Sequence, residues 1–249
     1  KHNDADDLFT LKFDFPVGTE NSNAFDVAST LLDYAGTNKM TANEIKTAFY
    51  GLACNYSVSV SKDHTGFTIS GLNENMPKAL NHLMENARIG KKEYSNVVSL
   101  ILKNQQDQKK SQGSNFSALR NYGIYGEFNP TRNQMNAQEL KSASGNELLK
   151  SLRDVRHLSP MTVMYFGPEQ QTNVASLVKQ AYPKHKVSGK LPLTTKKYQA
   201  QPTEKSEVLI APYDAKNIYM MQYTNGNRQW TLDKAPIEDL FNAYFGGGM

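Results

Sequence analysis

The sequence lacks the defining features of several protein classes. Cys54 is the only cysteine among 249 residues, so no disulfide can form within the chain, and a single cysteine does not fix the compartment. No apolar stretch approaches the roughly 18 residues that a membrane-spanning helix requires. The N-terminal residues KHNDADDLFT also lack the apolar stretch of a signal peptide, which says little about localisation. We expect a soluble protein of undetermined compartment, with the periplasm or cell envelope as one option.

Charge of one sign is concentrated in only one segment. The formal net charge is +4, and the basic excess lies mainly in 184–205, where Glu204 is the only acidic residue. The lysines there are Lys184, Lys186, Lys190, Lys196, Lys197 and Lys205. No arginine and no glycine–aromatic binding motif accompanies them, so the segment is typical of a solvated linker and does not indicate nucleic-acid binding.

Hydrophobic spacing predicts strands and helices in alternation. Phe9, Leu11 and Phe13 alternate with polar residues, which indicates a half-buried strand. The other predicted strands are 56–60 and 67–70, joined as a hairpin through KDHTG, then 161–166, a buried strand, and finally 208–211 and 218–223. Helices are predicted over 24–34, after Thr41, over 76–88, 94–109 and 116–122, after Asn136 and Ser144, over 170–182, and from Pro236 to Gly246. This order predicts an α+β fold, a two-layer sandwich in which helices cover a mostly antiparallel mixed sheet.

Three helix starts carry the signature of a capping box, in which two residues exchange side-chain-to-backbone hydrogen bonds. The signatures are Thr41-x-x-Glu44, Asn136-x-x-Glu139 and Ser144-x-x-Glu147. Each predicts the first residue of a helix.

The chain contains an internal repeat with a period of 210 residues. This shift carries Leu8 onto Ile218, Phe9 onto Tyr219, Leu11 onto Met221, Phe13 onto Tyr223, Val27 onto Ile237, Tyr34 onto Tyr244 and Gly36 onto Gly246. Solenoid repeats have periods of about 20–50 residues, so this longer period indicates duplication of a whole domain.

The repeat predicts three segments. Residues 1–182 form a complete domain, 183–206 are a basic linker, and 207–249 are the truncated start of a second homologous domain. We therefore expect the chain to be an excerpt of a longer protein. A strand pair and one helix bury their own apolar face poorly, so 207–249 should pack on the first domain or allow self-association.

His82-Leu-Met-Glu85 nearly spells the zinc-binding sequence HxxEH, with Asn86 in place of the last histidine. On a helix at 100° per residue, His82 and Glu85 lie opposite the apolar stripe that contains Leu80 and Leu83. The positions therefore predict an exposed polar surface. The other histidines, His2, His64, His157 and His185, show no metal-ligand spacing, and a metal enzyme built on His64, His82 and Glu85 is the least favoured interpretation.

Several motifs resemble the pitrilysin/insulinase (inverzincin) family of zinc metallopeptidases. They are LDYAGTNKMTANEIKTAFYGLACNYSVSVSKDHTGFTISGLNENMPKAL, MTVMYFGPE and FNAYFGGGM, and the resemblance extends over essentially the whole chain. It implies duplicated α+β domains, arranged in two halves that close around a peptide substrate. In catalytic halves of the family, HxxEH lies on the first helix, ahead of a Gly-Thr pair.

The resemblance places this chain in the non-catalytic, C-terminal half. Alignment on Gly36-Thr37 puts Val27, Thr30 and Leu31 at the family's two histidine positions and its glutamate, and none of them can bind zinc. The family's third ligand is a later glutamate, but no glutamate occurs from 95 to 126. In the second unit the equivalent residues are Ile237, Leu240 and Phe241, which are also expected in a core. The family's Arg/Tyr pair for substrate lies beyond YFGGGM, so Arg228 does not qualify.

These positions predict no catalytic residue and no metal ligand in this chain, and they leave the substrate-binding residues unknown. The first hypothesis is an inactive excerpt of a zinc endopeptidase, which encloses the peptide chamber while the catalytic half supplies the zinc. The alternative is a non-catalytic structural or binding subunit of a processing-peptidase-like complex.

Overall fold

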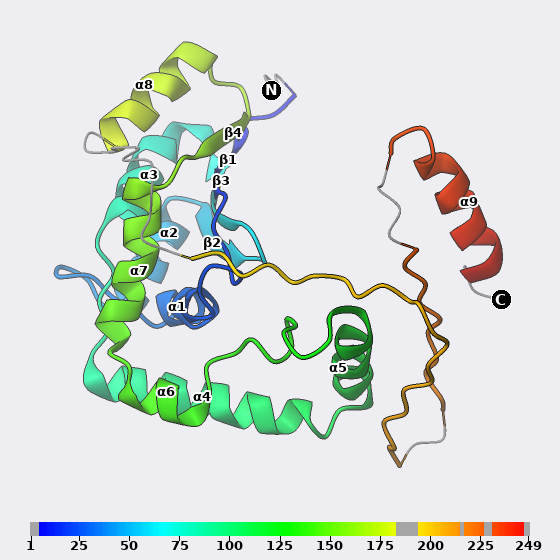
Figure 1. Cartoon of the computed structure of the whole chain (residues 1–249). Coiled ribbons are helices and arrows are strands. Elements are labelled where there is room, and N and C mark those ends of the chain that lie inside the picture. Colours follow the sequence, from blue (N-terminus) through cyan, green and yellow to red (C-terminus); the bar gives the residue numbers. More distant parts are fainter. Residues whose placement is uncertain (1–4, 183–193, 215–216, 227–230, 247–249) are drawn as a thin grey trace.

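The computed structural model describes residues 5–182, 194–214, 217–226 and 231–246 (Figure 1). One sheet organises the first domain, with the strand order β2-β3-β1-β4. Its strands are β1 (Leu8–Phe15), β2 (Cys54–Val60), β3 (Thr65–Leu72) and β4 (Thr162–Phe166). All three pairings are antiparallel, so the expected mixed sheet is, within the described residues, purely antiparallel.

The central strand β1 explains why helices cover one face of this sheet. Phe9, Leu11, Phe13 and Phe15 are buried, whereas the residues between them are exposed or half-buried. Because successive side chains of a strand point to opposite faces, these four buried side chains all point to the face of the sheet that the helices cover. The α+β sandwich is confirmed.

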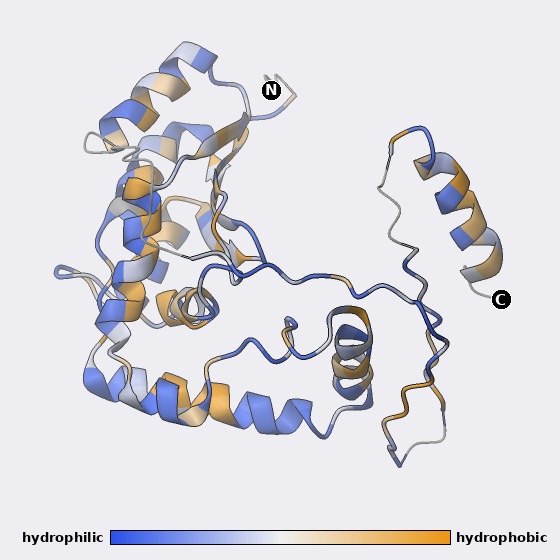
Figure 2. Cartoon of the chain, in the orientation of Figure 1, coloured by the Kyte–Doolittle hydropathy of each residue, from blue (hydrophilic) through white to orange (hydrophobic). Residues whose placement is uncertain are grey.

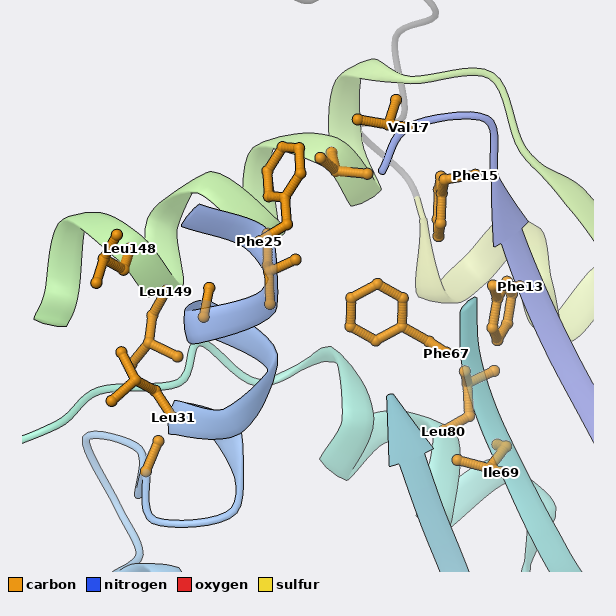
Figure 3. Close-up of a cluster of buried hydrophobic side chains, with 14 of the residues drawn as sticks. Phe13, Phe15, Val17, Phe25, Leu31, Phe67, Ile69, Leu80, Leu148 and Leu149 are labelled. Carbon is orange, nitrogen blue, oxygen red and sulfur yellow. The ribbon is translucent and has the colours of Figure 1, made fainter. Parts of the chain in front are cut away.

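Five helices pack on or beside that face: α1 (Ala24–Leu32), α2 (Ala42–Gly51), α3 (Met76–Met84), α7 (Gly145–Leu158) and α8 (Gln171–Ala181). A 3-10 turn, η1 (Asn73–Asn75), precedes α3. Helix α1 packs against α7, where Leu31 lies beside Leu149 in the core (Figure 3). Leu31 and the strand phenylalanines are therefore parts of one hydrophobic core.

The remaining helices extend away from the sheet. Helix α4 (Lys91–Gln108) reaches outward with α6 (Ala137–Ser142) alongside, and α5 (Gln112–Tyr125) stands beyond its far end (Figure 1). Tyr94 joins α4 to α6 by donating a 2.6 Å hydrogen bond to the carbonyl of Leu140.

Two of the three predicted capping boxes are confirmed. Thr41–Glu44 and Asn136–Glu139 each make both reciprocal bonds at the start of α2 and α6. Helix α7 does start at Ser144, as predicted, but the Ser144 side chain makes no capping hydrogen bond, so the capping box predicted there is wrong. Helix α3 also ends at Met84, earlier than the predicted residue 88.

Strand β4 corrects a second prediction. Its sequence, TVMYF, indicated a buried strand, but Val163, Met164 and Phe166 are 37–44% exposed. The strand pairs with β1 at the edge of the sheet, where a continuous apolar run is less completely covered than in the centre. Apolar composition alone did not distinguish an edge strand from a central one.

The strands predicted over 208–211 and 218–223 are wrong. Neither segment is assigned to a sheet, and Val208, Ile210, Ile218 and Met220 are 79–93% exposed. Helix α9 (Ala235–Gly246) forms as predicted and contains many hydrophobic residues (Figure 2). Its large apolar side chains are exposed. The 207–226 segment touches the first domain at α5, where the Phe116 and Tyr219 ring centroids are 5.5 Å apart.

Part of the predicted linker is docked on the first domain. Residues 183–193 lie outside the described residues, but 195–201, which we call the strap, is held by hydrogen bonds at several points. Tyr198 is only 9% exposed, and its amide donates a 2.8 Å bond to the Glu20 carboxylate. Its hydroxyl accepts from Asn133 at 2.7 Å, and its ring packs on Phe128 at 4.9 Å between centroids. The strap is therefore exposed along its length except at Tyr198, where these contacts anchor it.

Candidate functional site

The face of α1 that the family resemblance makes comparable to HxxEH is closed. Val27 is 5% exposed and Leu31 is fully buried, with Leu31 beside Leu149 (Figure 3). Thr30 is half-buried, and its hydroxyl donates to the carbonyl of Asp26 at 3.2 Å. Two aliphatic side chains and a hydroxyl bonded within its own helix do not fit a zinc ion, which takes nitrogen, sulfur or carboxylate ligands.

The equivalent residues of α9 do not form a core. Ile237, Leu240 and Phe241 are 61–71% exposed, so the expectation that they would be buried is wrong. No residue of α9 is buried, so no other described part of the chain covers this helix.

The described part of the chain contains no group of three or more histidine, cysteine, aspartate or glutamate side chains arranged to hold a metal. His64 lies at the β2–β3 hairpin, where its Nδ1 is 3.1 Å from Asp63 Oδ1 and its Nε2 is 3.7 Å from Asp14 Oδ2. His82 lies on a different element, α3. His157 lies on α7 beside Tyr182. His2, His185 and Arg228 fall outside the described residues.

His82 and Glu85 line a cavity, which contradicts their predicted exposure on a polar surface. The cavity lies among α1, α2, β2, β3, α3 and α7. His82 faces α2, where its ring centroid is 5.9 Å from that of Phe49, and its Nδ1 is buried without a hydrogen-bond partner among the described residues. The helical projection failed for two reasons: the Phe49 ring of α2 packs beside His82, and Glu85 follows the helix in an extended conformation.

The walls of this cavity are mainly apolar, and its charges come mainly from α7. Ile45, Phe49, Tyr56, Val58 and Phe67 contribute apolar or aromatic surface. A volume of about 70 Å³ exceeds the roughly 10–15 Å³ that one water molecule requires and is about half of the roughly 150 Å³ that holds benzene, so it fits two or three water molecules or a group of about three carbons.

Arg153 and Arg156 lie one turn apart on α7, and both line the cavity. Arg156 is 6% exposed, donates a 2.6 Å hydrogen bond to the carbonyl of Leu83 and lies 5.4 Å above the Phe67 ring. Burial lowers the pKa of Arg156, and the charge of Arg153 lowers it further, whereas Tyr182 acts in the opposite direction. Two like charges thus face one small space, with Glu85 as the acidic residue that also lines it.

The sequence analysis did not predict that Arg153 and Arg156 line the same cavity as His82. The available signal was their spacing of three residues, which at 100° per residue places both arginines on the same side of the helix as Leu149 and Leu152. That spacing indicates a shared face, but it does not reveal which neighbouring elements enclose it. The cavity depends on side chains from six elements, so it emerges only in three dimensions.

The geometry defines an α+β domain of the type found in M16 (pitrilysin-family) peptidases, as the resemblance predicted. The chain is similar to a solved M16 peptidase inactive domain from Pseudomonas fluorescens, with a TM-score of 0.63, 17% identity, and coverage of 77% of this chain and 49% of that one. It is also similar to the periplasmic protease PqqL from Escherichia coli, with a TM-score of 0.63, 14% identity and coverage of 84% and 24%. For the ferredoxin protease FusC, solved with Arabidopsis ferredoxin, the values are 0.62, 15%, and 79% and 22%.

These likenesses establish the fold. The chain spans between about a quarter and a half of the length of these solved structures. No protein-family model and no curated protein matches the sequence. Within the described residues, no helix combines the length and the apolar character needed to cross a bilayer.

Proposed function

We propose that this chain is a non-catalytic segment of an M16 zinc metallopeptidase and forms part of the wall that encloses a peptide substrate. The observation that supports this most is the composition of α1. Where the resemblance expects two histidines and a glutamate, the fold has Val27 and Leu31 in its core and Thr30 bonded within the helix.

The fold likeness supports the same proposal. One similar structure is itself named an inactive domain of an M16 peptidase, and the others are proteases. In the complete enzyme, zinc in the catalytic half would polarise the scissile carbonyl and activate water. This chain's residues do not fit that role, so its contribution is to position and enclose the peptide. A periplasmic location, as named for PqqL, is part of this proposal.

The test combines metal analysis with reconstitution. We expect the isolated chain to bind no stoichiometric zinc and to leave an unfolded reporter peptide uncut, and we expect it to restore cleavage when mixed with the matching catalytic half. Val27→Ala provides the control, because it changes α1 without adding a ligand. One tightly held zinc ion per isolated chain, or chelator-sensitive cleavage by it, would overturn the proposal.

A structural or binding subunit is the second candidate, and the exposed apolar surface of 207–246 favours it. Ile218, Met220 and the large apolar residues of α9 are 61–93% exposed, and exposed apolar residues that lie together mark interaction surfaces. Such a subunit would pair with a separate catalytic chain or with another copy through this surface. Reconstitution separates the two candidates: restored cleavage supports the peptidase segment, whereas stable association without cleavage supports the binding subunit.

A further inference from the structure

The cavity among α1, α2, β2, β3, α3 and α7 has features of a small-molecule site that the proposed peptidase role does not use. It lies within the helical layer, behind the sheet, and it combines an apolar interior with charged groups from α7 and from the loop after α3. The space of about 70 Å³ is open on one side and is lined there by Arg153, so a ligand can enter it from solvent.

Two arginines and one carboxylate, that of Glu85, line this space, so basic groups outnumber acidic ones and the lining favours an anion. Arg153 is about one-third exposed, and its nearest acidic neighbour, Asp154, is 4.0 Å away and also pairs with Lys150 at 3.3 Å. Arg153 therefore retains donor capacity toward the cavity. Arg156 lies deeper and is fixed by its bond to the Leu83 carbonyl. An anion placed near Arg153 would relieve the repulsion between the two guanidinium groups.

The apolar walls define the rest of the ligand. Phe49, Tyr56 and Val58 offer aromatic and aliphatic surface without a second cluster of cations. His82 adds one buried ring nitrogen, which can donate to or accept from a ligand oxygen. The complementary molecule thus has one carboxylate and a compact aliphatic body.

We propose that this cavity, which is open on one side, binds a short-chain fatty acid of about four carbons, whose propyl group fills the space and whose carboxylate lies at the open side beside Arg153. The carboxylate accepts hydrogen bonds from Arg153, and the alkyl group lies against Phe49 and Val58. This proposal is independent of the peptidase assignment, because it concerns the helical side of the first domain alone.

The test is a titration of the isotope-labelled full chain with butyrate, followed by amide NMR. Saturable shifts are expected at residues of α2, β2 and α7 that line the cavity. Butanol and butylamine have the same number of carbons as butyrate but no negative charge. Because a charge-assisted hydrogen bond is lost, we expect butanol to bind at least about tenfold more weakly.

Three variants locate the site. Arg153→Gln removes the charge from a partly exposed position and should weaken butyrate binding about tenfold while leaving butanol unchanged. Val58→Phe fills the space and should abolish binding of both. Lys150→Gln, one turn away on α7 and outside the cavity, is the matched control and should bind as the unmodified chain does. Thermal melting of each variant verifies that it is folded.

Several outcomes would overturn the proposal. Equal affinity for butyrate and butanol would indicate an apolar void without an anion site. Unchanged butyrate binding by Arg153→Gln would remove the carboxylate contact. Shifts confined to 207–246 would indicate adsorption to the exposed apolar tail. Binding of a peptide with a C-terminal leucine, in the absence of butyrate binding, would assign the cavity to peptide instead.

Discussion

Two segments that a shift of 210 residues aligns with each other both form a helix, but only the first of them forms a strand. In the first segment, β1 is paired on both sides and its phenylalanines are buried. In the second, residues 218–223 belong to no sheet, and Ile218 is 93% exposed, yet α9 forms at the position equivalent to α1. A helix satisfies most backbone groups within its own segment, whereas a strand needs partners elsewhere in the chain. The shared hydrophobic pattern is therefore sufficient for a helix in both segments, α1 and α9, but it produces a paired strand only in the first.

The largest expected contrast lies on the two equivalent helices. Leu31 is fully buried and Phe241 is 61% exposed. We expect Leu31→Ala to lower the free energy of unfolding by about 2–5 kcal/mol, because it removes core contacts and leaves a cavity. Phe241→Ala should change it by less than about 0.5 kcal/mol. Urea unfolding measures both, and equal effects would show that α9 is buried as α1 is.

The next contrast is a pH effect at Tyr182, which packs against Phe13 with ring centroids 5.3 Å apart. Burial raises the pKa of Tyr182 to about 12, with Arg156 opposing the shift. The raised pKa means that stability is intact below pH 10 and decreases as the pH rises toward 12, because only the unfolded chain ionises readily. The decrease is on the order of 2–3 kcal/mol at 1.36 kcal/mol per pKa unit.

Unfolding free energies measured from pH 9 to 12 test this effect. The decrease should be smaller in Tyr182→Phe, whereas Tyr213→Phe, on the exposed tail, should retain it. If Tyr182→Phe kept the full decrease, other groups would be responsible.

A third contrast is between the strap, which contacts the first domain through Tyr198, and the exposed segment that contains Tyr213. Lys196 and Lys197 are exposed trypsin sites, but Tyr198 and Glu20 hold their backbone. We expect Tyr198→Ala to accelerate cleavage there roughly tenfold or more, because a buried ring and its hydrogen bonds are lost. Tyr213→Ala is the control on the tail. Rapid cleavage at Lys196 and Lys197 in the unmodified chain would show that the strap is not docked.

The smallest expected effect concerns the capping box of α2. Thr41 accepts from the Glu44 amide at 3.3 Å, and the Glu44 carboxylate accepts from the Thr41 amide at 2.7 Å. Thr41→Ala should lower the free energy of unfolding by about 1 kcal/mol. Ser144→Ala, at a helix start without a side-chain bond, should have almost no effect on the same thermal or urea curve. A reversed order would contradict the assignment of the caps.

The parts of the fold that sequence predicted are those with local causes. The alternation of Phe9, Leu11 and Phe13 specified β1, and residues three apart specified the caps at Thr41 and Asn136. Predictions failed where a residue's exposure depends on contacts with residues far away in the sequence. The exposure of Val163 depends on the edge position of β4, and the docking of Tyr198 depends on Glu20 and Asn133.

The candidate site shows the same division. The alignment on Gly36-Thr37 correctly placed Val27 and Leu31 in a core, because apolar spacing on one helix is a local signal. His82 and Glu85 were misplaced, since their environment is determined by α2 and α7 rather than by their own segment. Cavities assembled from many elements leave little trace in the sequence of any one of them.

Hydrogen exchange of α1 and α9, measured on the same chain with and without zinc, tests the central claim most directly. The account predicts that the amides of 27–31 exchange only when the whole domain unfolds, that those of 237–241 exchange orders of magnitude faster, and that zinc changes neither. Zinc-dependent protection of α1, or equal protection of the two helices, would contradict it.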